Sequence, residues 1–135
     1  MITETAFGLR VELAIPYGAA IERTTAALKT EGFGVLTTID MRAALKEKLG
    51  RDIRPYAILG ACNPPLASRA LDAEQDIGLL LPCNVIVYER EDGHATVAAM
   101  APLAALGVVG ENAALQGVAT EADARLRRAL AQVAR

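Results

Sequence analysis

The sequence has few aromatic side chains and no excess of charge of either sign. Its 135 residues include no Trp, three Tyr and two Phe, and the formal net charge is −2. So few rings argue against a platform on which nucleic-acid bases stack. A charge balance near zero gives no long-range attraction for phosphate backbones or anionic lipid. No apolar run approaches the roughly 20 residues of a membrane helix. We therefore expect neither a nucleic-acid partner nor a membrane span.

Cysteine and histidine are equally scarce, with only Cys62, Cys83 and His94 in the whole chain. One disulfide between the two cysteines is arithmetically possible. However, residues 1–5 show no basic segment followed by an apolar stretch, so we expect no signal peptide. Disulfides are rare in reducing compartments, so the prediction is a cytoplasmic protein with reduced thiols.

The length and composition predict one domain covering residues 1–135. The chain is 53% hydrophobic, above the usual share of about 45–50%. Most of the excess is Ala, which is easily buried. The excess is therefore a mild indication of self-association.

Hydrophobic periodicity predicts an alternation of strands and helices in the first half of the chain. Residues 7–15 alternate apolar and polar side chains, which is typical of a half-buried strand. Gly32 and Gly50 are placed to end helices in the left-handed conformation, and Asp40 to begin one as its N-cap. The expected elements are strands at 7–15, 33–39 and 56–62 and helices at 19–31, 41–49 and 66–74.

The second half predicts a hairpin followed by a C-terminal helix. Residues 78–81 and 83–89 read as strands separated by Pro82, which indicates an edge or a bulge. Asp92-Gly93 is a hairpin turn signal, so residues 85–88 should pair with residues 96–100. Thr120 with Asp123 resembles a capping box that begins the last helix after a partly helical connector at 101–117. This order predicts an α+β fold, a mostly antiparallel sheet with helices packed on one face.

Two Cys-Asn pairs, Cys62-Asn63 and Cys83-Asn84, each lie next to proline where a strand meets a turn or bulge. Such irregularities often aim side chains at a site. These four residues are our candidate ligand-binding set, a pocket lined by two thiols and two amides on neighbouring strand ends. Alternatively, the cysteines only pack in the core and the asparagines satisfy local backbone groups.

Other chemistry is left open by the same residues. A thiol-dependent enzyme or redox protein would use Cys62 or Cys83, but the only histidine, His94, follows a turn and is expected to be solvated. A metal or haem carrier would combine the thiols with His94 or Met100, although no close-spaced ligand pair is present. Arg51 and Arg54 beside Tyr56 could hold an acidic ligand or simply face water. No catalytic residue and no resident metal is predicted.

Several stretches together resemble the family known as domain of unknown function 302. The central ones are residues 54–56 (RPY), 59–67 (LGACNPPLA) and 77–89 (IGLLLPCNVIVYE), and residues 32–37 (GFGVLT) and 45–50 (LKEKLG) are also similar. The resemblance implies a curved antiparallel sheet of the TATA-binding-protein-like type, with one sheet face free of helices. Open apolar faces are usually covered, often by a second copy.

Composition and resemblance together lead to one working hypothesis. We expect a non-enzymatic, cytoplasmic small-ligand-binding or stress-accessory domain that acts as a homodimer. A TATA-binding-like architecture does not imply DNA binding, because a fold does not determine a function.

Overall fold

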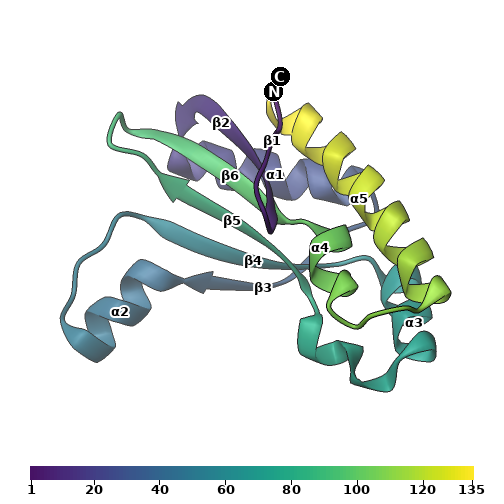
Figure 1. Ribbon diagram of the computed structural model, residues 1–135. Helices are drawn as coiled ribbons and strands as arrows, with labels where there is room; N and C mark the ends of the chain where they lie inside the picture. Colours follow the sequence, from purple (N-terminus) through teal and green to yellow (C-terminus); the bar gives the residue numbers. More distant parts are fainter.

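The computed structural model describes residues 1–135 as a six-stranded sheet with five α-helices and one 3-10 helix (Figure 1). The strands are β1 (Thr3–Glu4), β2 (Gly8–Pro16), β3 (Gly34–Asp40), β4 (Tyr56–Cys62), β5 (Cys83–Glu89) and β6 (His94–Met100). The helices are α1 (Tyr17–Thr30), α2 (Met41–Leu49), α3 (Pro64–Ala73), the 3-10 helix η1 (Gln75–Leu80), α4 (Pro102–Gly107) and α5 (Ala113–Val133). The fold is therefore α+β, as the sequence predicted.

The sheet is antiparallel throughout, in the order β1-β2-β6-β5-β4-β3. The predicted hairpin is confirmed, because β5 pairs with β6 and Val85 lies opposite Ala99. The register then continues through Leu9 on one side and Leu59 on the other, and all four side chains are buried. Since side chains alternate along a strand, this row fixes which face of the sheet is the core.

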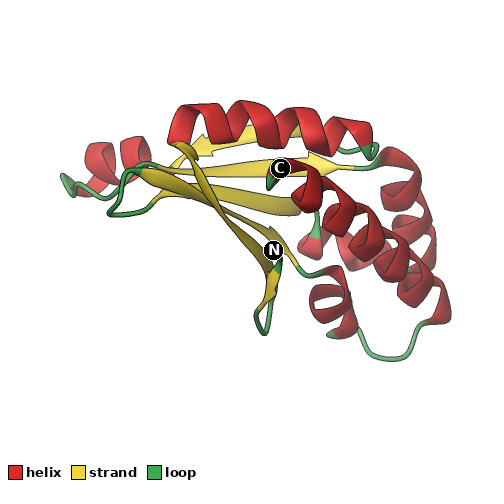
Figure 2. Cartoon of the chain, turned by 90° about the horizontal axis from the view of Figure 1, so that it is seen from above, coloured by secondary structure: helices red, strands yellow, loops and turns green.

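Helices α1 and α5 cover that core face, and the opposite face carries no helix (Figure 2). The main hydrophobic cluster joins the inward side chains of β2, β4, β5 and β6 to α1 and to the second half of α5. A second cluster lies at one end of the sheet, between α3, η1, α4 and the first half of α5. No helix combines the length and the apolar character that crossing a membrane requires.

The predicted helix ends around α2 are confirmed. The Asp40 side chain accepts the backbone N–H of Ala43, and Gly50 ends the helix at a φ of 65°. Gly32, just after α1, has a φ of 85°. Both glycines occupy the left-handed region that other residues rarely adopt.

Two predictions near the end of the chain were wrong. Residues 78–81 do not form a strand, because η1 occupies residues 75–80 with the Glu74 carboxylate accepting the Asp76 N–H at its start. The last helix begins at Ala113, not after Thr120, and its N-cap is Asn112. Thr120 lies inside α5, where its hydroxyl donates to the Gln116 carbonyl one turn earlier. A threonine can form such a hydrogen bond inside a helix as well as cap its start, so the sequence alone does not distinguish the two positions.

Candidate functional site

A cavity of about 320 Å³ lies at the seam between the two hydrophobic clusters. Phe33 and Ala61 of the main cluster line one side, and Leu66, Val118 and other residues of the second cluster line the other. Of its 16 lining residues 14 are hydrophobic, and Asn63 is the only one with a polar side chain. The full lining is Phe33, Leu36, Ala61, Cys62, Asn63, Leu66, Ala67, Ala70, Leu71, Leu81, Pro82, Cys83, Met100, Leu106, Val118 and Ala122.

The arrangement of the two clusters explains why the cavity exists. Helix α5 runs past both clusters, so its two halves pack on different groups of side chains. Small residues, among them Ala61, Ala67 and Ala122, line the gap instead of filling it. Leu36 and Leu71 keep exposed surface and mark the mouth of the cavity.

Both thiols are brought to this cavity by neighbouring strands. Cys62 is the last residue of β4, and Cys83 is the first residue of β5, opposite Ala61. Both cysteines are free and half-buried. Met100, the last residue of β6, also lines the cavity. The ends of three adjacent strands thus carry both thiols and one of the three methionines to one place.

Burial controls the chemistry of the Cys83 thiol. Loss of solvation, together with a smaller effect of the nearby Cys62, raises the pKa of Cys83 from the usual 9.0 to about 11. At neutral pH roughly one Cys83 in ten thousand is then a thiolate. Since the thiolate is the nucleophile, Cys83 behaves as a neutral, polarisable wall of the cavity.

Asn63 lines the cavity, but its amide already has partners. Its Oδ1 accepts the Leu66 N–H (3.2 Å) as the N-cap of α3, and its Nδ2 donates to the Glu31 carbonyl (3.3 Å). Gly32 makes this approach possible, because a Cβ there would lie 2.9 Å from the Asn63 Nδ2. Asn63 therefore ties the end of α1 to the start of α3 and holds one wall of the cavity in place.

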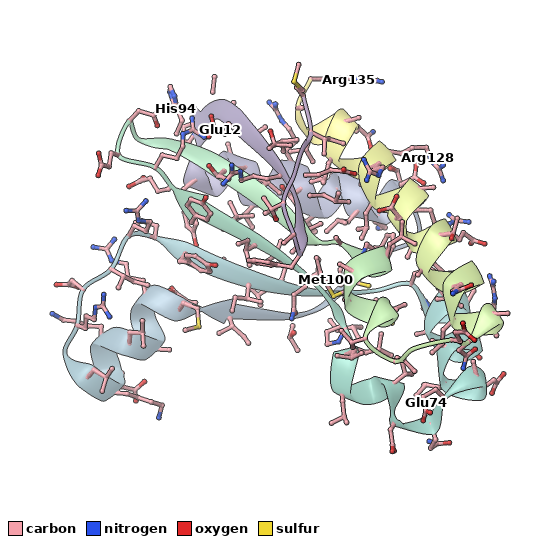
Figure 3. All side chains as sticks on the ribbon, viewed as in Figure 1. Glu12, Glu74, His94, Met100, Arg128 and Arg135 are labelled. Atoms are coloured by element: carbon pink, nitrogen blue, oxygen red, sulfur yellow. The ribbon has the colours of Figure 1, made fainter.

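The remaining candidate residues lie outside the cavity. Asn84 follows Cys83 but is exposed on the other face of the sheet, opposite Gly60. His94 begins β6 and Met100 ends it, so His94 is at the other end of the strand from the cavity that Met100 lines (Figure 3). Arg51 and Arg54 are exposed. No group of three His, Cys, Asp or Glu side chains is placed to hold a metal ion.

Comparison with known families gives one match that covers nearly the whole chain. Residues 9–133 match the model of the family described as Domain of unknown function DUF302. The chain belongs to the DUF302 family. A crystal structure of an uncharacterized conserved DUF302 protein from Bacillus stearothermophilus is 32% identical, with a TM-score of 0.87. The similarity covers 97% of this chain and all of that one. A comparison with curated proteins finds no match.

Membership of DUF302 carries no established activity, so the site must be interpreted from its own residues. The sequence pattern located Cys62, Asn63 and Cys83 through their prolines. It missed the cavity walls supplied by α4 and α5, such as Leu106 and Val118. These residues belong to an Ala- and Gly-rich stretch with no motif, and only the packing of α5 across both clusters reveals them.

Proposed function

We propose that this DUF302 domain binds a small, neutral, mostly apolar ligand in the seam cavity, in contact with the thiols of Cys62 and Cys83. The observation that carries the proposal is an apolar cavity of about 320 Å³ whose lining contains no charged side chain. This volume is at the lower end of known ligand pockets. A charged ligand would lose its hydration there without a partner, which is costly.

A binding role fits the residues better than thiol catalysis. A nucleophilic cysteine needs a depressed pKa or a neighbouring base. The pKa of Cys83 is raised, and no His, Asp, Glu or Lys lines the cavity. Chromogenic disulfide reagents should therefore modify Cys83 slowly at neutral pH, whereas one fast thiol would favour the enzyme hypothesis. Cytoplasmic location, a stress-accessory role and the TATA-binding-protein-like type of sheet remain predictions.

The test is fluorescence titration with N-phenyl-1-naphthylamine, a neutral probe that brightens in apolar surroundings. We expect saturable binding of one probe per chain. Ala67 lines the cavity, so Ala67→Phe should fill it and abolish binding. The neighbouring Ser68 is exposed and outside the cavity, so Ser68→Phe adds the same ring to α3 and should leave binding intact. Equal binding by both variants would contradict the proposal.

A second candidate ligand is a soft monovalent metal ion such as Cu(I). It is favoured by the meeting of Cys62, Cys83 and Met100 at the cavity, because thiolate and thioether sulfur select such ions. Titration with Ag(I), a redox-inert substitute, should then release thiol protons. Met100→Leu should weaken binding, whereas Met41→Leu in α2 should not. Unchanged Ag(I) affinity after Cys62→Ala and Cys83→Ala would exclude this site.

A further inference from the structure

The sheet face opposite α1 and α5, here called the open face, presents a row of apolar side chains. Ile39, Ile58, Ile86 and Ala98 are paired in register across β3, β4, β5 and β6. Ile39 is 46% exposed, and the other three keep part of their surface. Next to this row Tyr56 and Tyr88 stack, with ring centroids 5.6 Å apart. In β2 the row continues into Arg10, so its apolar part spans β3 to β6. Contiguous exposed apolar side chains often mark an interaction surface.

Helix α2 also lacks a packing partner. None of its residues is buried, and Leu49 at its end is 71% exposed. The helix lies beside the edge strand β3 and extends beyond the sheet (Figure 1). A short helix with no buried side chain gains little stability from its own chain, because most helical stability comes from tertiary packing.

Opposite charges lie at one end of the open face, on either side of its centre. Residues 41–54, which form α2 and the loop into β4, contain five basic and two acidic side chains. Residues 89–92, at the β5–β6 turn, contain three acidic and one basic side chain, and Glu12 of β2 lies near this turn (Figure 3). Both groups are at the same end of the strands, because Tyr56 at the start of β4 pairs with Tyr88 near the end of β5.

We infer that the open face is covered by a second copy of this chain, related by a two-fold axis that runs parallel to the strands over β5. This axis exchanges the two sides of the sheet and keeps its ends, so basic residues 41–54 face the acidic turn of the other copy. Ile86 packs on itself across the axis, and Ile58 lies opposite the smaller Ala98 of the partner subunit. The strands of the two sheets stay nearly aligned, as in other packed sheets.

The area of the face supports a dimer of this kind. The sheet order places β2, β6, β5, β4 and β3 side by side, with about seven residues in each strand. Strand spacing and rise then give a face of about 550 Å², before side-chain relief and α2 are added. Stable interfaces bury roughly 800 Å² per partner, so the open face and α2 together are of the right size.

Analytical ultracentrifugation of the intact chain over a concentration series is the test. The parent should sediment as a dimer. Ile86→Lys places two like charges together on the axis. The dissociation constant of the dimer should therefore rise at least roughly a hundredfold above that of the parent. Leu79→Lys is the control, because Leu79 is 87% exposed on η1 and outside the face. Circular dichroism establishes that both variants are folded.

Charge reversal tests the axis itself. Arg42→Glu with Lys48→Glu should weaken the dimer, and so should Glu12→Lys with Glu91→Lys. All four changes in one chain should restore it, because each copy then offers the reversed pattern to the other. A monomeric parent, or a folded Ile86→Lys variant that remains a dimer, would overturn the inference. Separate weakening without recovery in the fourfold variant would overturn the axis.

Discussion

The buried thiol of Cys83 should make the free energy of unfolding depend on pH in the alkaline range, by an amount that follows from its surroundings. Burial raises the pKa of Cys83 from the usual 9.0 to about 11 in the folded chain, while the unfolded chain keeps the usual value. Between these values the unfolded state has lost the proton and the folded state has kept it. The free energy of unfolding therefore falls as pH rises above 9, and the contribution is fully present below that pH.

The loss can be worked out from the two pKa values. Linkage gives a loss of about 1 kcal/mol by pH 10 and about 2 kcal/mol by pH 11. Burial also raises the pKa of Tyr17 and Tyr56, so these side chains lower stability at alkaline pH in every variant. The contribution of Cys83 is therefore the difference between the parent and Cys83→Ala, not the absolute fall.

Urea unfolding at pH 8, 10 and 11 in the presence of reductant measures this difference. The parent should lose more stability than Cys83→Ala by the amounts given above. Cys62→Ala is the matched control and should keep most of the loss, because burial outweighs the proximity of Cys62 as the cause of the shift. If the parent and Cys83→Ala lose stability in parallel, Cys83 is not desolvated in the folded chain and the interpretation of the cavity wall is wrong.

Substitutions at three further positions, Gly60, Asn63 and Thr24, test the packing of the site and of the core. Gly60→Ala places a Cβ 2.4 Å from the Thr37 hydroxyl oxygen, so unfolding in urea should show a loss of about 1–3 kcal/mol, smaller in a Thr37→Ala background. Asn63→Ala should lower the free energy of unfolding by about 1–2 kcal/mol, because the N-cap of α3 is lost. Asn63→Asp should recover part of this loss, since a carboxylate still caps α3 but cannot donate to the Glu31 carbonyl. Equal losses in the two variants would show that the cap contributes nothing. The Thr24 hydroxyl is buried without a hydrogen-bond partner, so Thr24→Val should be neutral or stabilising by about 1 kcal/mol, and a loss of melting temperature would refute this.

Local signals in the sequence were sufficient for most of the fold. The alternation around Leu9, the Asp92-Gly93 turn and the Asp40 cap each fix a short segment through its own backbone chemistry, and the structure has them where expected. The wrong predictions concern segments whose residues are compatible with two kinds of secondary structure. Leu79 and Leu80 suit a strand or a helical turn equally well, and the capping of η1 by Glu74 decides between them.

The candidate site was accessible from the sequence only in part. Cys62 and Cys83 stood out because prolines interrupt their strands, and both line the seam cavity from the adjacent ends of β4 and β5. Asn84 was predicted beside them, but alternation along β5 turns it to the other face. The apolar walls depend on how α5 spans two clusters, which is a property of tertiary packing and has no local signal.

A crystal structure of the chain soaked with N-phenyl-1-naphthylamine would show whether the seam cavity is the binding site. We expect density for one probe molecule inside the seam cavity, in contact with Cys62 and Cys83 and enclosed by Phe33 and Val118. A probe bound at full occupancy on the open face or on another surface, with no density in the seam cavity, would contradict the proposed binding site.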